Sequence, residues 1–176
     1  SIWLAENKLK AGSNYTVIDT FKGSIEHGMI GTNTRKDKDE NFIENNFRHN
    51  ISLHKDINWN IIKGESQIEL PKMNLIPTYD LIYIDGSHRS DDTFIDAYYS
   101  NKLLKEDGII IFDDFAWKDP NDPRVVTSPE FGIKSFFELY NDQYDAITFH
   151  NDKGEHQQTY QAYFRKKKSN YIKGTF

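Results

Sequence analysis

The most constraining feature of the sequence is a nearly continuous apolar run at residues 79–85, Tyr-Asp-Leu-Ile-Tyr-Ile-Asp. Runs of this kind are typical of strands that are buried on both faces of a parallel sheet. A second run with the same character, Gly-Ile-Ile-Ile-Phe, occupies residues 108–112, and a helical pattern lies between the two. Because parallel neighbours need a crossover connection, this segment predicts a strand, helix and strand in succession.

Strands and helices alternate along the rest of the chain. The pattern predicts further strands at 15–19 and 60–63, and helices at 1–7, around 42–47, at 66–70, from 90 to the Asp-Gly pair at 107–108, and at 131–140. Two last strands, 144–149 and 159–164, have only the polar turn 151–154 between them, which predicts an antiparallel hairpin. The expected fold class is therefore α/β: a three-layer, doubly wound, mostly parallel sheet that ends in a hairpin.

Side-chain patterns also predict which residues pack. We expect Ser90 or Asp91 to cap the long helix. Its apolar side should carry Phe94, Ile95, Tyr98, Leu103 and Leu104. Trp3 and Trp59 are assigned to packing.

Size and composition indicate one folded domain. The 176 residues are 37% hydrophobic and 14% aromatic, enough for a single core. We expect a domain at residues 1–165 and a polar tail at 166–176, which begins with three lysines. Twenty-two basic against 27 acidic residues give a net charge of −5, which argues against a nucleic-acid partner.

Cysteine content and hydropathy limit the setting of the protein. The chain has no cysteine, which excludes disulfides, thiolate nucleophiles and cysteine-ligated metals, and fits a reducing, cytoplasmic location. No apolar run approaches the roughly 20 residues that cross a bilayer, so no membrane partner is expected. A homo-oligomer is left open.

Acidic residues end the predicted strands. Asp19 closes the first strand and Asp85 the third, and Asp113 and Asp114 follow the fourth. The carboxyl ends of parallel strands form the edge where doubly wound folds bind ligands, and neighbouring strands lie about 5 Å apart. Carboxylate oxygens suit magnesium, so the pattern predicts a divalent cation site. The alternative is that Asp85 only caps the following helix.

His88 follows Asp85 by three residues and is a candidate general base. Histidine is the side chain that exchanges a proton most readily near neutral pH. The alternative is an ordinary surface histidine, since the chain has six histidines.

Two segments carry a resemblance to a known family. Residues 79–88 end in Ile-Asp-Gly-Ser-His, and residues 103–114 end in Phe-Asp-Asp. Together they resemble class I S-adenosylmethionine-dependent methyltransferases, and among these the magnesium-dependent O-methyltransferases similar to catechol and macrocin-type sugar O-methyltransferases. The resemblance spans nearly the whole chain. It implies a Rossmann-like methyltransferase fold, S-adenosylmethionine and Mg²⁺ as cofactors, and methyl transfer to a hydroxyl of a small molecule or sugar.

The resemblance also assigns roles at the site. It implies that Asp85, Asp113 and Asp114 hold the metal, which could be magnesium or another divalent cation. His88 occupies the position at which the catechol enzymes carry a catalytic lysine. The resemblance therefore implies a base at this position, with histidine in place of lysine.

Cofactor contacts are implied in the same way. Asp19 matches the acid that binds the ribose hydroxyls, and Asp85 is assigned to the cofactor as well as to the metal. Glu65, Ser66 and Gln67 follow a glycine in a turn similar to the Gly-Ala-Ser-Gln turn whose Ser and Gln contact adenine. The alternative for this turn is a helix start with Ser66 as N-cap.

The sequence departs from the family at its start. Family members begin with a strand and a Gly-rich turn directly before the helix expected at residues 1–7, and neither is present. We interpret the chain as truncated at its N-terminus. A real loss would favour the alternative of a non-catalytic, methyltransferase-like interaction module.

A third alternative is a magnesium enzyme that acts on phosphates. The sequence has no Gly-rich phosphate loop, which counts against it. In the methyltransferase interpretation the loop at 116–129 borders the acceptor, with Trp117 as the lid residue. The alternative for Trp117 is a packed surface tryptophan.

Overall fold

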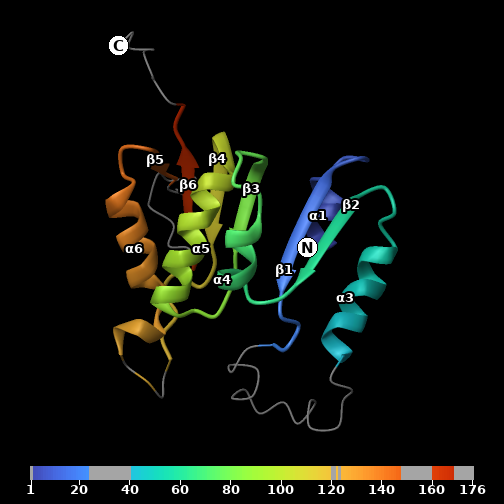
Figure 1. Ribbon diagram of the computed structural model, residues 1–176, viewed down its shortest axis with the longest axis horizontal. Coiled ribbons are helices and arrows are strands. Elements are labelled where there is room, and N and C mark those ends of the chain that lie inside the picture. Colours follow the sequence, from blue (N-terminus) through green and yellow to red (C-terminus); the bar gives the residue numbers. More distant parts are fainter. Residues whose placement is uncertain (1, 24–40, 120–121, 123, 148–159, 169–176) are drawn as a thin grey trace, which may run out of the picture. The chain divides into compact units, whose positions relative to one another are not determined.

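The computed structural model describes residues 2–23, 41–119, 122, 124–147 and 160–168. The chain divides into two compact units, Ser1–Glu69 and Leu70–Phe176 (Figure 1). We call them the first and second units and describe each by itself. Among the described residues, no helix is both long enough and apolar enough to cross a membrane.

The first unit is built on two parallel strands. Its elements are α1 (Ile2–Asn7), β1 (Asn14–Asp19), α3 (Phe42–Ser52), β2 (Asn58–Lys63) and α4 (Ser66–Glu69). The strands pair from Asn14↔Asn58 to Asp19↔Lys63, which confirms the parallel arrangement expected for this half of the chain. Residues 22–38, for which the sequence pattern predicts no helix or strand, fall mostly outside the described residues.

Aromatic side chains stabilise the first unit. The Trp59 ring lies 4.9 Å from that of Tyr15, and its indole nitrogen donates a hydrogen bond to the carbonyl of His54. The packing role predicted for Trp59 is thereby confirmed. The prediction for Trp3 was wrong: this side chain is 61% exposed, because α1 buries none of its residues.

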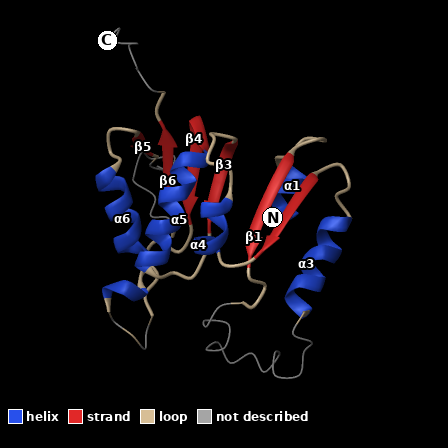
Figure 2. Ribbon diagram, viewed as in Figure 1, coloured by secondary structure: helices blue, strands red, loops and turns tan. Residues whose placement is uncertain are grey.

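The second unit is a four-stranded mixed sheet with helices (Figure 2). Its elements are η1 (Leu70–Lys72), β3 (Tyr79–Ile84), α5 (Ser90–Leu103), β4 (Leu104–Phe112), η2 (Val125–Thr127), α6 (Pro129–Leu139), β5 (Tyr144–Ala146) and β6 (Ala162–Lys166). The strand order is β3-β4-β6-β5. Strands β3 and β4 are parallel, and β6 is antiparallel to both β4 and β5. The expected antiparallel pairing at the C-terminal end is confirmed, while the turn at 151–154 lies outside the described residues.

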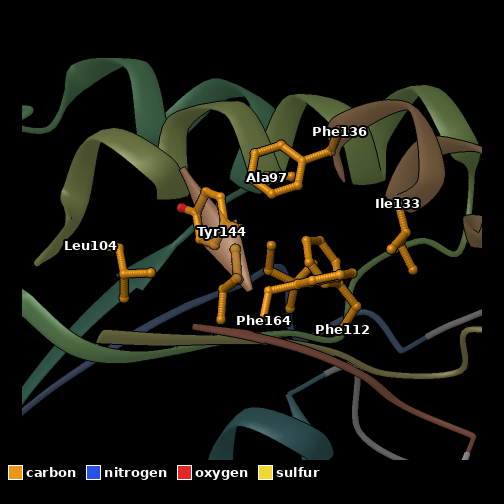
Figure 3. Packing of buried hydrophobic residues seen from close by; sticks show 9 residues of the cluster. Ala97, Leu104, Phe112, Ile133, Phe136, Tyr144 and Phe164 are labelled. Carbon is orange, nitrogen blue, oxygen red and sulfur yellow. The ribbon is translucent and has the colours of Figure 1, made fainter. Parts of the chain in front are cut away.

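The core of the second unit lies between the sheet and the helices α5 and α6. Figure 3 shows Ala97 and Phe136 from the helices over Phe112 and Phe164 from the strands. Phe112 and Phe136 are fully buried, and the rings of Phe112 and Phe164 meet edge to face at 5.8 Å. Side chains alternate along each strand, and Ile82 and Ile84 of β3, Ile110 and Phe112 of β4, and Ala162 and Phe164 of β6 belong to this core or pack against it.

Helix α5 buries part of the apolar side that the pattern predicts, since Leu103 is buried and Phe94 packs against the core. Ile95, in contrast, is 36% exposed, and the buried residues include the polar Thr93, Asp96, Ser100 and Asn101. Small side chains such as Ala97 allow α5 to approach its neighbours closely, so close packing also decides which face is buried.

The ends of α5 also differ from the prediction. Arg89 precedes the helix and no side chain caps it. The helix ends at Leu103 because Leu104 has extended backbone (φ −79°, ψ 130°). The Asp-Gly pair at 107–108 therefore lies inside β4, where the pairing with β3 is irregular.

At the C-terminal end, Lys166 is the last residue of β6 rather than the first of a solvated tail. Its ammonium group donates a hydrogen bond to the carbonyl of Leu104 at 3.1 Å. Burial lowers the pKa of Lys166, although the charge of Glu106 acts in the opposite direction. The strand therefore extends beyond the predicted domain boundary at residue 165.

The closest approach between α5 and α6 occurs at Gly132. The Ser90 hydroxyl donates to the carbonyls of Val125 (2.8 Å) and Ser128, which fixes the start of α5 against the start of α6. A Cβ at Gly132 would lie 2.2 Å from the Ser90 carbonyl oxygen, a backbone atom that cannot move aside cheaply.

We therefore predict that Gly132→Ala destabilises the protein although alanine is the better helix former. The expected loss in free energy of unfolding is roughly 1–3 kcal/mol, measured by urea denaturation. Glu138→Ala on the exposed side of α6 is the control and should change stability by less than about 0.5 kcal/mol. A Gly132→Ala variant as stable as the wild type would contradict the close packing.

Candidate functional site

Strands β3 and β4 bring the acidic residues of the second unit to one edge. Ile84 is paired with Phe112, and the amide of Asp113 donates to the carbonyl of Ile84 at 2.9 Å. Asp85 directly follows β3 and Asp113 directly follows β4, so both lie at the carboxyl end of this pair of parallel strands. This is the position that the sequence pattern predicts.

Three side chains converge at this edge: Asp85, His88 and Asp114. One potential ligand atom from each lies within 4.8 Å of the other two. His88 Nε2 is 3.5 Å from a carboxylate oxygen of Asp114. His88 is only 7% exposed, Asp85 is exposed and Asp114 is half-buried, so the group opens to solvent on its acidic side. We call these three residues the acidic-histidine cluster.

Two of the three cluster residues have unusual backbone conformations. His88 has φ +58° and Asp114 has φ +49°. Both values lie in the left-handed region, which His and Asp adopt more readily than most residues but still at a cost. Conformations of this kind persist only where the surroundings hold them, and they concentrate at functional sites.

Trp117 covers His88. The two rings lie 5.1 Å apart, inclined by 38°, and the amide of Trp117 donates to the carbonyl of Asp114 at 2.8 Å. The residue predicted as a lid is thus placed beside the cluster and helps to bury His88.

Asp113 is beside the cluster but not one of its three members. Its carboxylate accepts hydrogen bonds from the Tyr83 hydroxyl, from the Gln161 amide at 2.9 Å and from the backbone amide of Asp114 at 3.0 Å. A carboxylate offers about four acceptor positions, so three hydrogen bonds leave room for one further ligand.

Tyr83 and Gln161 are site residues that the sequence analysis missed. Burial, followed by the hydrogen bond to Asp113 and the nearby carboxylates, raises the pKa of Tyr83, which therefore remains a hydrogen-bond donor at neutral pH. Tyr83 could have been found, because it lies two residues before Asp85 and so on the same strand face. Gln161 gave no signal, because it enters through the pairing of Phe112 with Ala162 on β6.

The cluster has the donor set of a divalent cation site. Two carboxylates and one imidazole are ligands that Mg²⁺, Mn²⁺ or Zn²⁺ accept, and carboxylate and water ligands favour the harder cations. The residues present therefore fit a divalent cation, with Asp113 next to them as a further carboxylate.

In the first unit, Asp19 lies beside the turn that was predicted to contact adenine. It is paired with Lys63, and its carbonyl accepts a hydrogen bond from the amide of Gly64 at 3.0 Å. The carboxylate of Asp19, an exposed residue, accepts a hydrogen bond from the amide of Phe21 at 2.7 Å through Oδ1. Phe21 itself is buried and has φ +57°.

The turn after Gly64 opens helix α4. The carbonyl of Glu65 accepts hydrogen bonds from the amides of Ile68 and Glu69, and Ser66 is the first residue within the helix rather than its N-cap. Glu65 is exposed, while Ser66 and Gln67 are half-buried. These residues and Asp19 share one end of the β1–β2 pair.

Comparison with known proteins identifies the family of this chain. A family model described as a methyltransferase domain (Methyltransf_24) matches residues 1–115, well over half of the chain. A comparison with curated proteins finds no match.

Solved structures with a similar fold include several O-methyltransferases. The O-methyltransferase NovP aligns with a TM-score of 0.58 at 16% identity over 94% of this chain, which spans 64% of the length of NovP. An O-methyltransferase from Bacillus cereus, solved in complex with SAH, gives 0.51 at 18% identity over 95% of this chain and 68% of its own. CalS11, a TDP-rhamnose 3'-O-methyltransferase, gives 0.50 at 14% identity over 85% and 57% of the two chains. Identities this low establish a shared fold.

The geometry predicts that the loss of Asp114, a member of the cluster, weakens cation binding more than the loss of Asp113, which lies beside the cluster. Asp114→Ala should weaken binding of Mn²⁺, used as a spectroscopic probe, by about tenfold or more, because it removes one of three converging groups. Asp113→Ala should cost less than about threefold, since its carboxylate is already hydrogen-bonded. Electron paramagnetic resonance of free Mn²⁺ measures both affinities.

Asp80→Ala is the matched control for this experiment, because the side chain of Asp80 is 84% exposed and pairs with Lys105 near the start of β3. If Asp80→Ala and Asp114→Ala weaken Mn²⁺ binding equally, only the net charge matters and the cluster is not a binding site.

Proposed function

Because the chain belongs to the methyltransferase domain family (Methyltransf_24), we propose that it takes part in S-adenosylmethionine-dependent methyl transfer to a hydroxyl oxygen, assisted by a divalent cation such as Mg²⁺. The observation that carries this proposal is the convergence of Asp85, His88 and Asp114 at the carboxyl ends of two paired parallel strands. A metal-assisted reaction on a hydroxyl requires carboxylates and a base in one place, and this edge supplies both.

We further propose that the chain up to the end of β6 belongs to one methyltransferase-like domain of the doubly wound, three-layer class, with a polar tail after it.

Five residues are proposed to contact the cofactor. The two carboxylate oxygens of Asp19 match the two ribose hydroxyls of S-adenosylmethionine, and Ser66 and Gln67 are proposed to contact the adenine. Glu65 and Asp85 complete the proposed cofactor set. Bound S-adenosylmethionine supplies an activated methyl group on its sulfonium.

The cation would be held by Asp85 and Asp114, and Asp113 would contribute more weakly as a third proposed ligand, through the one acceptor position that its hydrogen bonds leave open. When bound, a divalent cation lowers the pKa of a coordinated hydroxyl and fixes its orientation. The hydrogen bonds from Tyr83 and Gln161 keep the Asp113 carboxylate directed along the edge of the sheet.

His88 is proposed to act as the base rather than as a cation ligand, and to accept the proton that the acceptor hydroxyl releases. Its imidazole lies within 3.5 Å of Asp114, which stabilises the protonated form that results. Trp117 packs on the ring and excludes water from that side. The chain itself thus orients the acceptor and removes its proton.

A sugar or polyol with two adjacent hydroxyls is the acceptor class that we favour, with other small molecules as the wider alternative. Two neighbouring oxygens can bind one cation together, and the face of Trp117 can stack against a sugar ring. The similarity in fold to CalS11, which acts on TDP-rhamnose, supports this choice.

We predict that His88→Ala lowers turnover by roughly 10²–10⁴-fold and leaves the affinity for S-adenosylhomocysteine within about twofold of the wild type. The assay is transfer of labelled methyl groups to vicinal diols, among them catechol and TDP-rhamnose. His88→Gln, which preserves hydrogen bonding without a base, should be impaired to a similar extent. Equal losses of turnover and cofactor affinity in His88→Ala would contradict the assignment as base.

A further inference from the structure

We propose that Asp96, on helix α5, is a positioning residue that holds the turn from Asp85 to His88 in the conformation that binds the cation. This inference rests on the proposed cation site and deepens it, because Asp96 lies behind the turn rather than in the cluster. Five observations support it.

The turn itself needs external support. It supplies two of the three cluster groups, Asp85 and His88, within four residues. Its middle residues, Gly86 and Ser87, are exposed, and its last residue has φ +58°. A short exposed segment that contains a residue with left-handed backbone does not keep two side chains in fixed positions without contacts from a rigid neighbour.

Asp96 lies directly against this turn. A Cβ built on Gly86 would be 3.2 Å from Asp96 Oδ2, a contact tighter than most real Cβ contacts. Gly86 is therefore the residue that allows the carboxylate to approach, and a larger side chain would separate the two. Asp96 is only 4% exposed, so its position is fixed by packing.

A second acid of α5 contacts the same turn. Ser87 Oγ donates a hydrogen bond to Asp92 Oδ2 at 2.6 Å. Asp92 and Asp96 are four residues apart on the helix and so lie on one face. Two consecutive turns of the helix therefore meet the turn at adjacent residues.

Helix α5 is itself firmly placed, so it can serve as the rigid neighbour. Its first residue, Ser90, is hydrogen-bonded to the segment before α6, and its Ala97 is fully buried in the core. A displacement of α5 would break these contacts, so the position of Asp96 relative to the sheet is determined by the core.

The residue type at position 96 also supports a positioning role. A buried position on a helix beside the core is ordinarily apolar, because a buried carboxyl group costs free energy unless it is hydrogen-bonded. Asp96 interacts with its surroundings, and it stands at a position where leucine or alanine would satisfy packing alone. Residues that orient metal ligands from behind commonly contribute 10- to 100-fold to metal affinity.

The test compares Mn²⁺ affinity with thermal stability in two variants that act differently. Asp96→Asn removes the charge but keeps the size, and Gly86→Ala keeps the charge but displaces the turn. Each should weaken Mn²⁺ binding by about tenfold, measured by electron paramagnetic resonance, while the melting temperature stays within a few degrees of the wild type. Asp80→Asn is the control, because it removes the same charge near the start of β3 and should bind Mn²⁺ like the wild type.

Each other outcome overturns a specific part of the account. Weaker binding by Asp96→Asn but not by Gly86→Ala would mean that only the charge matters, and Asp96 would not be a positioning residue. A lower melting temperature with unchanged Mn²⁺ affinity would make both residues purely structural. If the wild type itself binds no Mn²⁺, the proposed cation site fails and the role of Asp96 fails with it.

Discussion

The parallel pairing of β3 with β4 is the interaction on which the rest of the site depends. Because Ile84 is paired with Phe112, the residues that follow them leave the sheet together and their acidic side chains meet. A slip of one residue in this register would turn Ile84 and Phe112 out of the core and separate the acids. The buried side chains of both residues, packed under α5 and α6, prevent that slip. The same packing that stabilises the second unit therefore aligns its candidate site.

In the second unit, rigid packed helices support the site, and separate short segments carry its reactive groups. Helices α5 and α6 pack so closely at Ser90 and Gly132 that a methyl group does not fit between them. From this fixed base, α5 directs acidic side chains towards the turn that carries Asp85 and His88. The reactive groups lie on short segments after the strands, where solvent and substrate can reach them, while their positions are set by the core. This division is common in α/β proteins whose sites lie at the carboxyl edge of the sheet.

Much of this could be predicted from the sequence, because the signals were local. Apolar runs predicted the strands of both parallel pairs, and the acids that follow two of these runs predicted where Asp85 and Asp114 lie. The roles of these residues and of His88 stay predictions. The burial of Asp96 could not be foreseen, since close packing of small residues overrode the apolar pattern of α5. Gln161 was missed because a pairing between strands far apart in the sequence brings it to Asp113.

The central claim is that the chain binds S-adenosylmethionine and a divalent cation. Titration of S-adenosylhomocysteine into the purified protein by calorimetry, with and without Mg²⁺, tests this most directly. The account predicts a dissociation constant on the order of micromolar for the wild type and at least about tenfold weaker binding for Asp19→Ala, with the fold unchanged. Absence of binding by the folded wild-type protein under both conditions would contradict the account.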